Sequence, residues 1–260
     1  MSRNKDSVKN VLLVSITLCV VCSVVVSSVA VGLRDRQEAN AAKDKKKNVL
    51  LAAGIIDEKF DGDLDEKFAN ISAMMIDLST GMSVEGDVDG FDMGKAMNDP
   101  AGVVAITPEQ YPLGIKKRPK QVVAYIEKTD GKLTTVILPV VGQGLWSTMY
   151  GFLALDADLR SPKGLVFYEQ GETPGLGGEV DNPLWRDQFR ASRKRAFFKP
   201  DGTYDFTITK AGRADKNDPH EADGISGATI TCRGVDGMLR YWLSDAAFGP
   251  FLKELAKERN

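Results

Sequence analysis

Histidine and cysteine are scarce in this sequence, and their scarcity excludes several kinds of functional site. The only histidine is His220, and the three cysteines are Cys19, Cys22 and Cys232. Two of the cysteines lie within an apolar run and the third stands alone, so neither a disulfide framework nor a zinc-ligand pattern can be assembled from them. A single histidine also argues against a histidine-based metal site or a Ser-His-Asp triad. We therefore expect the chain to bind no metal ion.

The sequence also lacks a strong excess of charge of one sign. Its 34 Lys and Arg residues face 36 Asp and Glu residues, which gives a formal net charge of −2. Without a basic surface the chain is not expected to bind nucleic acid. Hydrophobic residues make up 43% of the 260 residues, which is enough for a membrane anchor and one medium-sized domain with its own core.

Residues 11–33 contain no charged side chain. As a helix this segment would span about 35 Å, more than the roughly 30 Å of a hydrocarbon core. A cleaved signal peptide with a cleavage site near Ala30 is the alternative, but its apolar region is usually only roughly 7–15 residues long. We predict a short N-terminal tail at residues 1–10 and a transmembrane helix at residues 11–33.

The charges that flank this segment leave its orientation open. Residues 1–10 contain three basic residues and one acidic residue, whereas residues 34–47 contain six basic and three acidic residues. A plain count of Lys and Arg would place the C-terminal side in the cytoplasm. Long following domains, however, cross the membrane largely regardless of such charges.

Cys19 and Cys22 lie three residues apart within the predicted transmembrane helix, on one helical face. We favour the interpretation that they are two small residues facing lipid or protein. If a partner subunit supplied two more thiolates, the four together would suit an iron site.

The rest of the chain predicts an α+β domain at residues 48–260, joined to the anchor by a polar helical linker at residues 34–47. Apolar residues recur at intervals of three or four between Phe60 and Met75, which predicts a helix over residues 57–75. A second helical pattern runs from Val235 to Leu243. Strands are predicted at residues 122–126, 133–140, 150–155, 165–168 and 206–209, with a turn at residues 130–131. Closely spaced strands joined by short turns favour a mostly antiparallel sheet.

Three segments contain residues that could bind a ligand. The first, Asp223-Gly-Ile-Ser-Gly-Ala-Thr229, precedes the last predicted helix. Its small residues allow a ligand or an enzyme to approach closely, and the N-terminus of a helix favours the binding of a phosphate group. The threonine hydroxyl could bind a phosphate or be esterified by one. The alternative is an ordinary helix cap formed by Ser226 or Thr229.

The other two segments are rich in glycine. Residues 171–178 follow a predicted core strand and contain four glycines. They are either a tight turn or a loop that packs on a flat ring with its amides and with Leu176. Residues 142–150 place two glycines beside Trp146 and Tyr150, which would form either an aromatic wall for an isoalloxazine ring or part of the core.

Three longer runs that include these segments together resemble one protein family. They are VVGQGLWSTMYGFLAL at residues 140–155, YEQGETPGLGGEVDNPLW at residues 168–185 and DGISGATITCRGVDGML at residues 223–239. They resemble the NqrC family, one of the subunit types of the bacterial Na⁺-translocating NADH:quinone oxidoreductases (Nqr). The resemblance covers nearly the whole chain, with one N-terminal span followed by an FMN-binding domain whose FMN-binding region would be about residues 140–247.

This resemblance implies a covalently bound FMN. A flavin transferase would take the FMN moiety from FAD and join its phosphate to Thr229, with Thr231 as the competing acceptor. The transferase would recognise Asp223, and no residue of the chain would be catalytic. The residues that the resemblance assigns to the cofactor are Thr229, Ser226, Gly227, Ala228, Asp223, Glu172, Thr173, Gly175, Leu176, Gly177 and Trp146.

The resemblance also implies partners and a location. It places residues 1–10 in the cytoplasm and the domain in the periplasm, against the plain charge count. The partners would be the other members of a sodium-pumping Nqr complex, namely NqrA, NqrB, NqrD, NqrE and NqrF. The chain would relay electrons from an iron centre to a covalent FMN in NqrB, and onward to riboflavin and ubiquinone, coupled to Na⁺ export.

Two alternatives remain at this point. Rnf-type ferredoxin:NAD⁺ oxidoreductases contain a related subunit with similar SGAT and ETPGLG segments. A membrane-anchored binding protein without a redox group would use the SGAT segment only as a helix cap. The chain has neither a dinucleotide-binding fingerprint nor an iron–sulfur cysteine set in its predicted soluble part, so we expect an electron carrier that is incomplete as an enzyme by itself.

Overall fold

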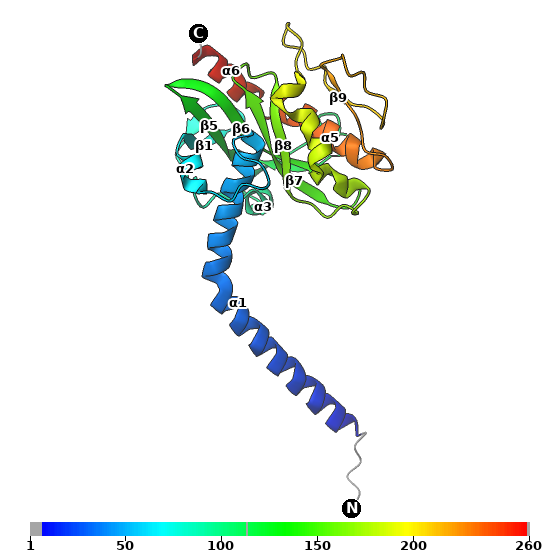
Figure 1. Cartoon of the computed structure of the whole chain (residues 1–260). Coiled ribbons are helices and arrows are strands. Elements are labelled where there is room, and N and C mark those ends of the chain that lie inside the picture. The colour runs from blue at the N-terminus through cyan, green and yellow to red at the C-terminus, as the bar shows by residue number, and fades with distance from the viewer. Residues whose placement is uncertain (1–6, 113, 259–260) are drawn as a thin grey trace, which may run out of the picture. The chain divides into compact units, whose positions relative to one another are not determined.

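A computed structural model describes residues 7–112 and 114–258 of the chain (Figure 1). The chain divides into two units, Met1–Lys45 and Lys46–Asn260, which are described in turn. Helix α1 (Val8–Ala53) contributes residues to both units.

The first unit consists of the larger part of α1. The stretch Val8–Arg34 is long and apolar enough to cross a membrane. It includes the predicted transmembrane segment at residues 11–33. The helix continues without a break through residues 34–47, where a polar helix was predicted. Residues 1–6 of the predicted N-terminal tail lie outside the described residues.

The second unit is built on a six-stranded sheet with the strand order β2-β1-β5-β6-β7-β8. Every neighbouring pair is antiparallel, which confirms the predicted sheet type. The predicted turn at Asp130 and Gly131 joins β5 to β6, and both residues have a positive φ, as a type I′ hairpin turn requires. The strands of this sheet are β1 (Ile71–Asp77), β2 (Ser83–Val84), β5 (Gln121–Thr129), β6 (Lys132–Gln143), β7 (Thr148–Asp156) and β8 (Pro162–Glu169).

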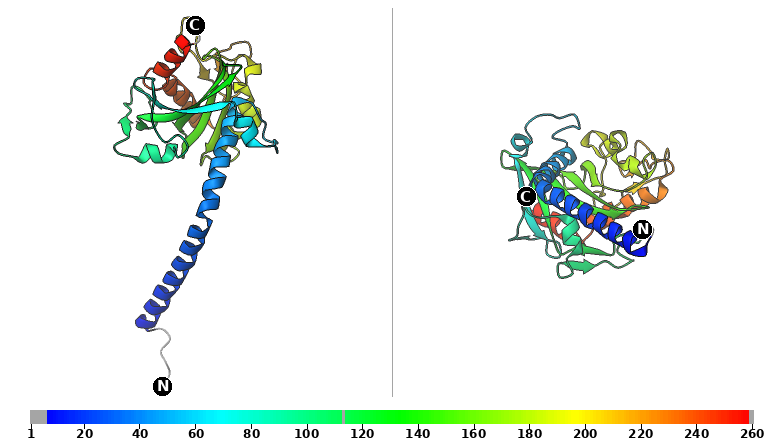
Figure 2. Two further views of the ribbon diagram at one scale, coloured as in Figure 1. Left: turned by 90° about the vertical axis from the view of Figure 1, so that its left-hand side faces the viewer. Right: turned by 90° about the horizontal axis from the view of Figure 1, so that it is seen from below.

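Both faces of this sheet are covered. Because successive side chains of a strand point to opposite faces, Val123 and Tyr125 of β5 pack against the last turns of α1, whereas Val122 and Ala124 face the C-terminal helices. Figure 2 shows the last turns of α1 and helix α6 on opposite sides of the strands. The larger of the two apolar clusters lies beneath α5 and α6.

The remaining elements are short, apart from the two C-terminal helices. Strands β3 (Val103–Ala105) and β4 (Lys117–Pro119) form an antiparallel pair, and β9 (Thr207–Ile208) and β10 (Glu221–Ala222) form a parallel pair. The predicted strand at residues 206–209 is therefore present but shorter. The helices are α2 (Leu64–Phe68), α3 (Met93–Asn98), α4 (Pro183–Arg186), α5 (Thr229–Trp242) and α6 (Gly249–Glu258), with 3₁₀ helices at Gly177–Asp181, Asp187–Phe189 and Ala191–Arg193.

The predicted helix over residues 57–75 is wrong for most of its length. Only α2 (Leu64–Phe68) is helical, and β1 follows after a turn. A spacing of four residues places Ile71 and Met75 on one face of a strand as well as on one face of a helix. Seven residues of β1 pair with β5, and this pairing decides in favour of the strand.

Helix α5 lies unusually close to β6. A Cβ atom at Gly234 would overlap the carbonyl oxygen of Gln143, so the absence of a side chain allows direct backbone contact. Farther along the helix, the indole Nε1 of Trp242 donates a hydrogen bond of 2.7 Å to the carbonyl of Val141. These two contacts hold α5 beside the end of β6, one near the middle of the helix and one at its last residue.

Candidate functional site

Helix α5 begins at Thr229 without a side-chain cap. Its N-cap residue is Ala228, and among the described residues no side chain provides a cap hydrogen bond. The interpretation of Ser226 or Thr229 as a capping residue is therefore wrong. The amides of the first turn have no acceptor within the helix, and they carry the positive end of the helix dipole. This helix start is suited to bind a phosphate group.

Thr229 and Thr231 differ sharply in accessibility. The side chain of Thr229 is exposed. Thr231 is only 1% exposed, and its hydroxyl donates a hydrogen bond of 2.7 Å to the Glu172 carboxylate. Of the two, only Thr229 presents a hydroxyl to solvent.

The Glu172 carboxylate connects the three predicted segments. Besides Thr231, it accepts hydrogen bonds from the backbone amides of Leu145, Trp146 and Ser147, at 3.0, 2.8 and 3.0 Å, and one of 3.2 Å from the Ser147 hydroxyl. Glu172 is 6% exposed. One buried carboxylate thus joins the loop after β6, the loop after β8 and the first turn of α5.

Two glycines make room for this carboxylate. A Cβ atom at Gly144 would lie 2.5 Å from Oε1 of Glu172. A Cβ atom at Gly177 would lie 2.6 Å from both Oε2 of Glu172 and the hydroxyl oxygen of Thr231. Part of the glycine content of the two loops is therefore explained by the space that the carboxylate needs.

The hydrogen bonds keep this carboxylate ionised. Burial alone would raise the pKa of Glu172, but the hydrogen bonds from Thr231 and from the three amides outweigh it, and the pKa lies below its ordinary value. A carboxyl whose pKa is lowered on folding stabilises the fold at pH values above its pKa in the unfolded chain. That stabilisation is lost as the pH falls through the lowered pKa of the folded state.

Large apolar side chains are exposed around this junction. Trp146 is 72% exposed, so the interpretation of Trp146 as a core residue is wrong. Leu176 and Ile230 are also exposed. Gly227 has a φ of +76°, and a Cβ atom there would lie 2.9 Å from Cδ2 of Leu176, which places this leucine against the SGAT segment. Exposed apolar side chains beside a few fixed polar groups are typical of a ligand-binding surface.

The remaining predicted residues lie in the same loops. Thr173 is exposed, and its carbonyl accepts hydrogen bonds from the amides of Leu176 and Gly178, which closes the turn around Gly175. Gly175 has a positive φ of 76°. The loop at residues 171–178 is thus a tight turn that also presents Leu176 to solvent, so its two interpretations are compatible.

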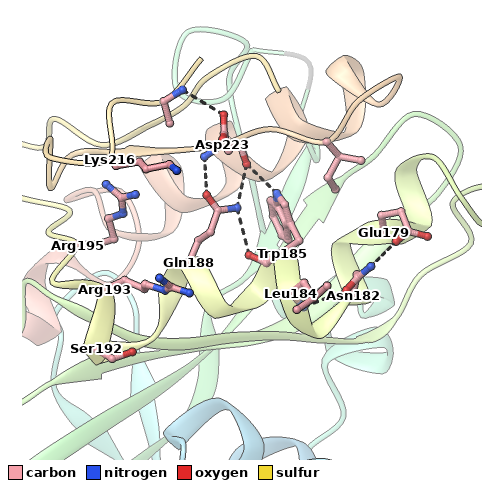
Figure 3. A pocket seen from close by; sticks show the side chains of 12 residues that line it. Glu179, Asn182, Leu184, Trp185, Gln188, Ser192, Arg193, Arg195, Lys216 and Asp223 are labelled. Carbon is pink, nitrogen blue, oxygen red and sulfur yellow. Dashed lines mark hydrogen bonds between the residues drawn. The ribbon is translucent and has the colours of Figure 1, made fainter. Parts of the chain in front are cut away.

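Asp223 lies beside a separate cavity of about 690 Å³ (Figure 3). Its carboxylate accepts hydrogen bonds from the amides of Arg213 and Ala214, at 2.9 and 3.1 Å. Its carbonyl accepts the indole N–H of Trp185 at 2.8 Å, and its own amide donates to Gln188 at 2.6 Å. Asp223 is thus held in place by its carboxylate, its carbonyl and its amide.

Two of the three cationic side chains that line this cavity are engaged within the protein. Arg193 forms an ion pair with Asp187, and Arg195 donates a hydrogen bond to the carbonyl of Asp218. Two residues after Asp223, the amide of Ile225 donates to the Cys232 sulfur at 3.1 Å. These contacts anchor the segment that enters the SGAT turn, while Ser226 and Gly227 are exposed.

Sequence reasoning missed the residues that connect the segments. Ser147 and the amide of Leu145 bind Glu172, and Thr231 does so from a position 59 residues away in sequence. Nothing in a local pattern indicates such a contact. The glycines at positions 144 and 177 are a signal of this contact. That signal can be interpreted only once the position of the carboxylate is known.

We predict that Gly227→Ala destabilises the second unit. The positive φ at this position costs an alanine about 1–2 kcal/mol, and the contact with Leu176 adds to that cost. Gly212→Ala is the matched control, because Gly212 has a φ of +71° and open space around it. Urea unfolding of the two variants should give a larger loss for Gly227→Ala, and equal losses would contradict the contact.

Comparison with known proteins agrees with this arrangement. The family described as FMN-binding domain matches residues 144–244, which include Glu172, Leu176 and Thr229. The fold and the site therefore define an FMN-binding domain.

Full-length relatives give a narrower assignment. The chain is 42% identical to the NqrC subunit of the Na⁺-translocating NADH-quinone reductase of Yersinia pestis, over 97% of this chain and 95% of that protein. It is 43% identical to the corresponding subunit of Vibrio anguillarum, over 98% of both chains. The crystal structure of Shewanella oneidensis NqrC covers 84% of this chain and 99% of its own, with a TM-score of 0.76 and 30% identity. The chain belongs to the NqrC family of Na⁺-translocating NADH-quinone reductases, and it is a subunit of an oxidoreductase complex.

Proposed function

We propose that this subunit carries FMN as a phosphoester on Thr229 and relays electrons within its sodium-pumping complex. The observation that carries the proposal is the exposed hydroxyl of Thr229 at the uncapped start of α5, with Thr231 buried two residues farther on. A tethered phosphate would replace the missing cap, because the amides of the first turn have no other acceptor within the helix.

The shape of the site fits the other end of the cofactor. An isoalloxazine ring is flat and largely apolar, and the exposed side chains of Trp146 and Leu176 offer surfaces of that kind. Gly227 and Ala228 add no bulk beside the tether, and Leu176 lies against Gly227. Thr173, Gly175 and Gly177 form the turn that presents Leu176. Bound FMN would supply a group that accepts and donates one or two electrons.

Attachment requires a donor and an enzyme. Joining Thr229 to the FMN phosphate of FAD forms a Thr–O–P bond, breaks the pyrophosphate bond and releases AMP, while the hydroxyl proton passes to a base. A flavin transferase with FAD as the donor satisfies this balance. We propose that it recognises the exposed turn at Ser226 and Gly227, in a loop whose position is fixed by Asp223.

We propose that residues 1–10 lie in the cytoplasm, that α1 anchors the subunit in the bacterial inner membrane and that the second unit lies in the periplasm. The apolar stretch Val8–Arg34 supports the anchor, and a periplasmic location is consistent with attachment of FMN after export. Lys216 is exposed in the second unit. A Lys216→Cys variant should react with a membrane-impermeant maleimide in intact cells whose outer membrane is permeabilised. Protection until the inner membrane is opened would refute this orientation.

The partners follow from the complex. We place this subunit between an iron centre and the FMN of NqrB, with NqrA, NqrD, NqrE and NqrF completing the path from NADH to riboflavin and ubiquinone and its coupling to Na⁺ export. The Rnf-type alternative has less support, because the full-length relatives are subunits of the Na⁺-translocating reductase. The alternative without a redox group has lost its basis, because no side chain of the SGAT segment caps α5.

Mass spectrometry tests this proposal directly. The peptide at residues 217–233, taken from protein made together with a flavin transferase, should carry the mass of one FMN moiety. The denatured protein should fluoresce on a gel under ultraviolet light, and NqrB should purify with it. A peptide of unmodified mass would refute covalent attachment.

A further inference from the structure

The strongest unexplained feature of the site is the position of the Glu172 charge. Five donors converge on its carboxylate: three successive backbone amides and two hydroxyls. Converging backbone amides of this kind form an anion-binding nest. Here the anion is a side chain of the protein itself, 6% exposed, rather than a ligand.

All five donors are neutral groups. The hydrogen bonds stabilise the charged carboxylate, but they do not cancel its charge as a lysine or arginine would. Among the described residues, Glu172 takes part in no ion pair. A net negative charge is therefore fixed beneath the loop that presents Trp146.

The same contacts set the relative positions of the ring-binding side chains and the tether. One carboxylate oxygen of Glu172 accepts a hydrogen bond from the amide of Trp146. The other accepts one from the hydroxyl of Thr231, in the first turn of α5. Because positions 144 and 177 are glycines, no side chain at either position pushes these segments apart. A shift of the carboxylate would change the position of Trp146 relative to Thr229.

We propose that Glu172 is the positioning residue of the flavin site and does not itself contact the ring face. It fixes Trp146 relative to the tether, and its uncompensated charge makes the site a less favourable place for added electrons. Glu172 therefore lowers the reduction potential of the bound flavin, because like charges repel more strongly where water is excluded. This inference rests on the proposed attachment at Thr229.

The test compares Glu172→Gln with Glu169→Gln in the full-length chain. Glu169 is an exposed glutamate three residues earlier, so its variant removes the same charge without touching the loops. In protein made without a flavin transferase, the amides of residues 145–147 should exchange hydrogen at least tenfold faster in Glu172→Gln and at the wild-type rate in Glu169→Gln. This measurement does not depend on bound flavin.

In protein made with the transferase, both variants should carry FMN on Thr229. Glu172→Gln should show an altered circular dichroism band of the flavin in the visible range and a higher reduction potential, whereas Glu169→Gln should match the wild type. Folded Glu172→Gln with the wild-type exchange rate, visible band and potential would overturn the proposal. Wild-type protein without the adduct would overturn the proposed function, and this inference with it.

Two milder variants cover the case in which Glu172→Gln does not fold. Ser147→Ala and Thr231→Val each leave the carboxylate in place and remove one hydroxyl donor. A purely structural role would only lower the unfolding temperature. The positioning role also requires a shift of the visible flavin band in Thr231→Val. Where Glu172→Gln folds, the shift in Thr231→Val should have the same direction and be smaller. Unchanged bands in both milder variants would overturn the proposal.

Discussion

Thr229→Val should abolish covalent FMN, and Thr231→Val should retain it. Each substitution removes one threonine hydroxyl, and the two positions lie two residues apart in the first turn of one helix. The hydroxyl of Thr229 is exposed, whereas that of Thr231 is buried and donates a hydrogen bond to Glu172. We expect complete loss of flavin fluorescence on a denaturing gel for Thr229→Val, and an FMN adduct on residues 217–233 for Thr231→Val.

The pair of variants controls for folding. Valine keeps the shape of threonine, and at the exposed position 229 it should leave the thermal unfolding of the flavin-free protein nearly unchanged. At position 231, valine removes one hydrogen-bond donor to Oε2 of Glu172, but the Leu145 amide still donates to that oxygen. An adduct that persists in Thr229→Val and disappears in Thr231→Val would reverse the assignment of the acceptor.

Trp242→Ala should unfold the second unit under mild conditions, whereas Trp146→Ala should not. Trp242 is fully buried between α5 and the sheet, and its indole donates to the Val141 carbonyl. Removing such a side chain costs about 3–5 kcal/mol, a large share of the stability of a typical domain. Urea unfolding of the full-length protein in detergent, followed by circular dichroism, measures the loss.

Trp146 provides the matched control. It is the same residue type at 72% exposure, and its removal should change the free energy of unfolding by no more than about 0.5 kcal/mol. The Trp146→Ala variant should nevertheless change the absorption and fluorescence of attached FMN, because its indole is proposed to lie against the ring. A large stability loss in Trp146→Ala would show that this side chain packs in the core after all.

Much of the fold follows from local patterns in the sequence. The amphipathic pattern from Val235 to Leu243 predicts α5, and the apolar runs of β5 to β8 predict the sheet, because these elements bury one or both faces. Helix α6 was not predicted, although Phe251, Leu252 and Leu255 have helical spacing and are buried. Its pattern covers only ten residues, and short patterns of this kind are weak evidence without the tertiary contacts.

The candidate site was predicted in part. A motif placed Thr229 at a helix start, which the structure confirms, and the two glycine-rich loops meet the first turn of that helix at Glu172. The helix-cap interpretation failed because Ala228 occupies the cap position, which composition alone does not reveal. The role of Glu172 depends on contacts with residues 25 to 59 positions away in sequence, and no local rule predicts those.

The backbone contact between Gly234 and Gln143 has a consequence for how this protein tolerates sequence drift. The spacing of α5 and β6 is set there by main-chain atoms, so it does not depend on the size of any core side chain. A change in the size of a neighbouring core side chain would leave the distance between the helix and the strand at this contact the same. Position 234 is then the exception, since any side chain there would lift α5 and carry Thr229 away from the loop that presents Trp146.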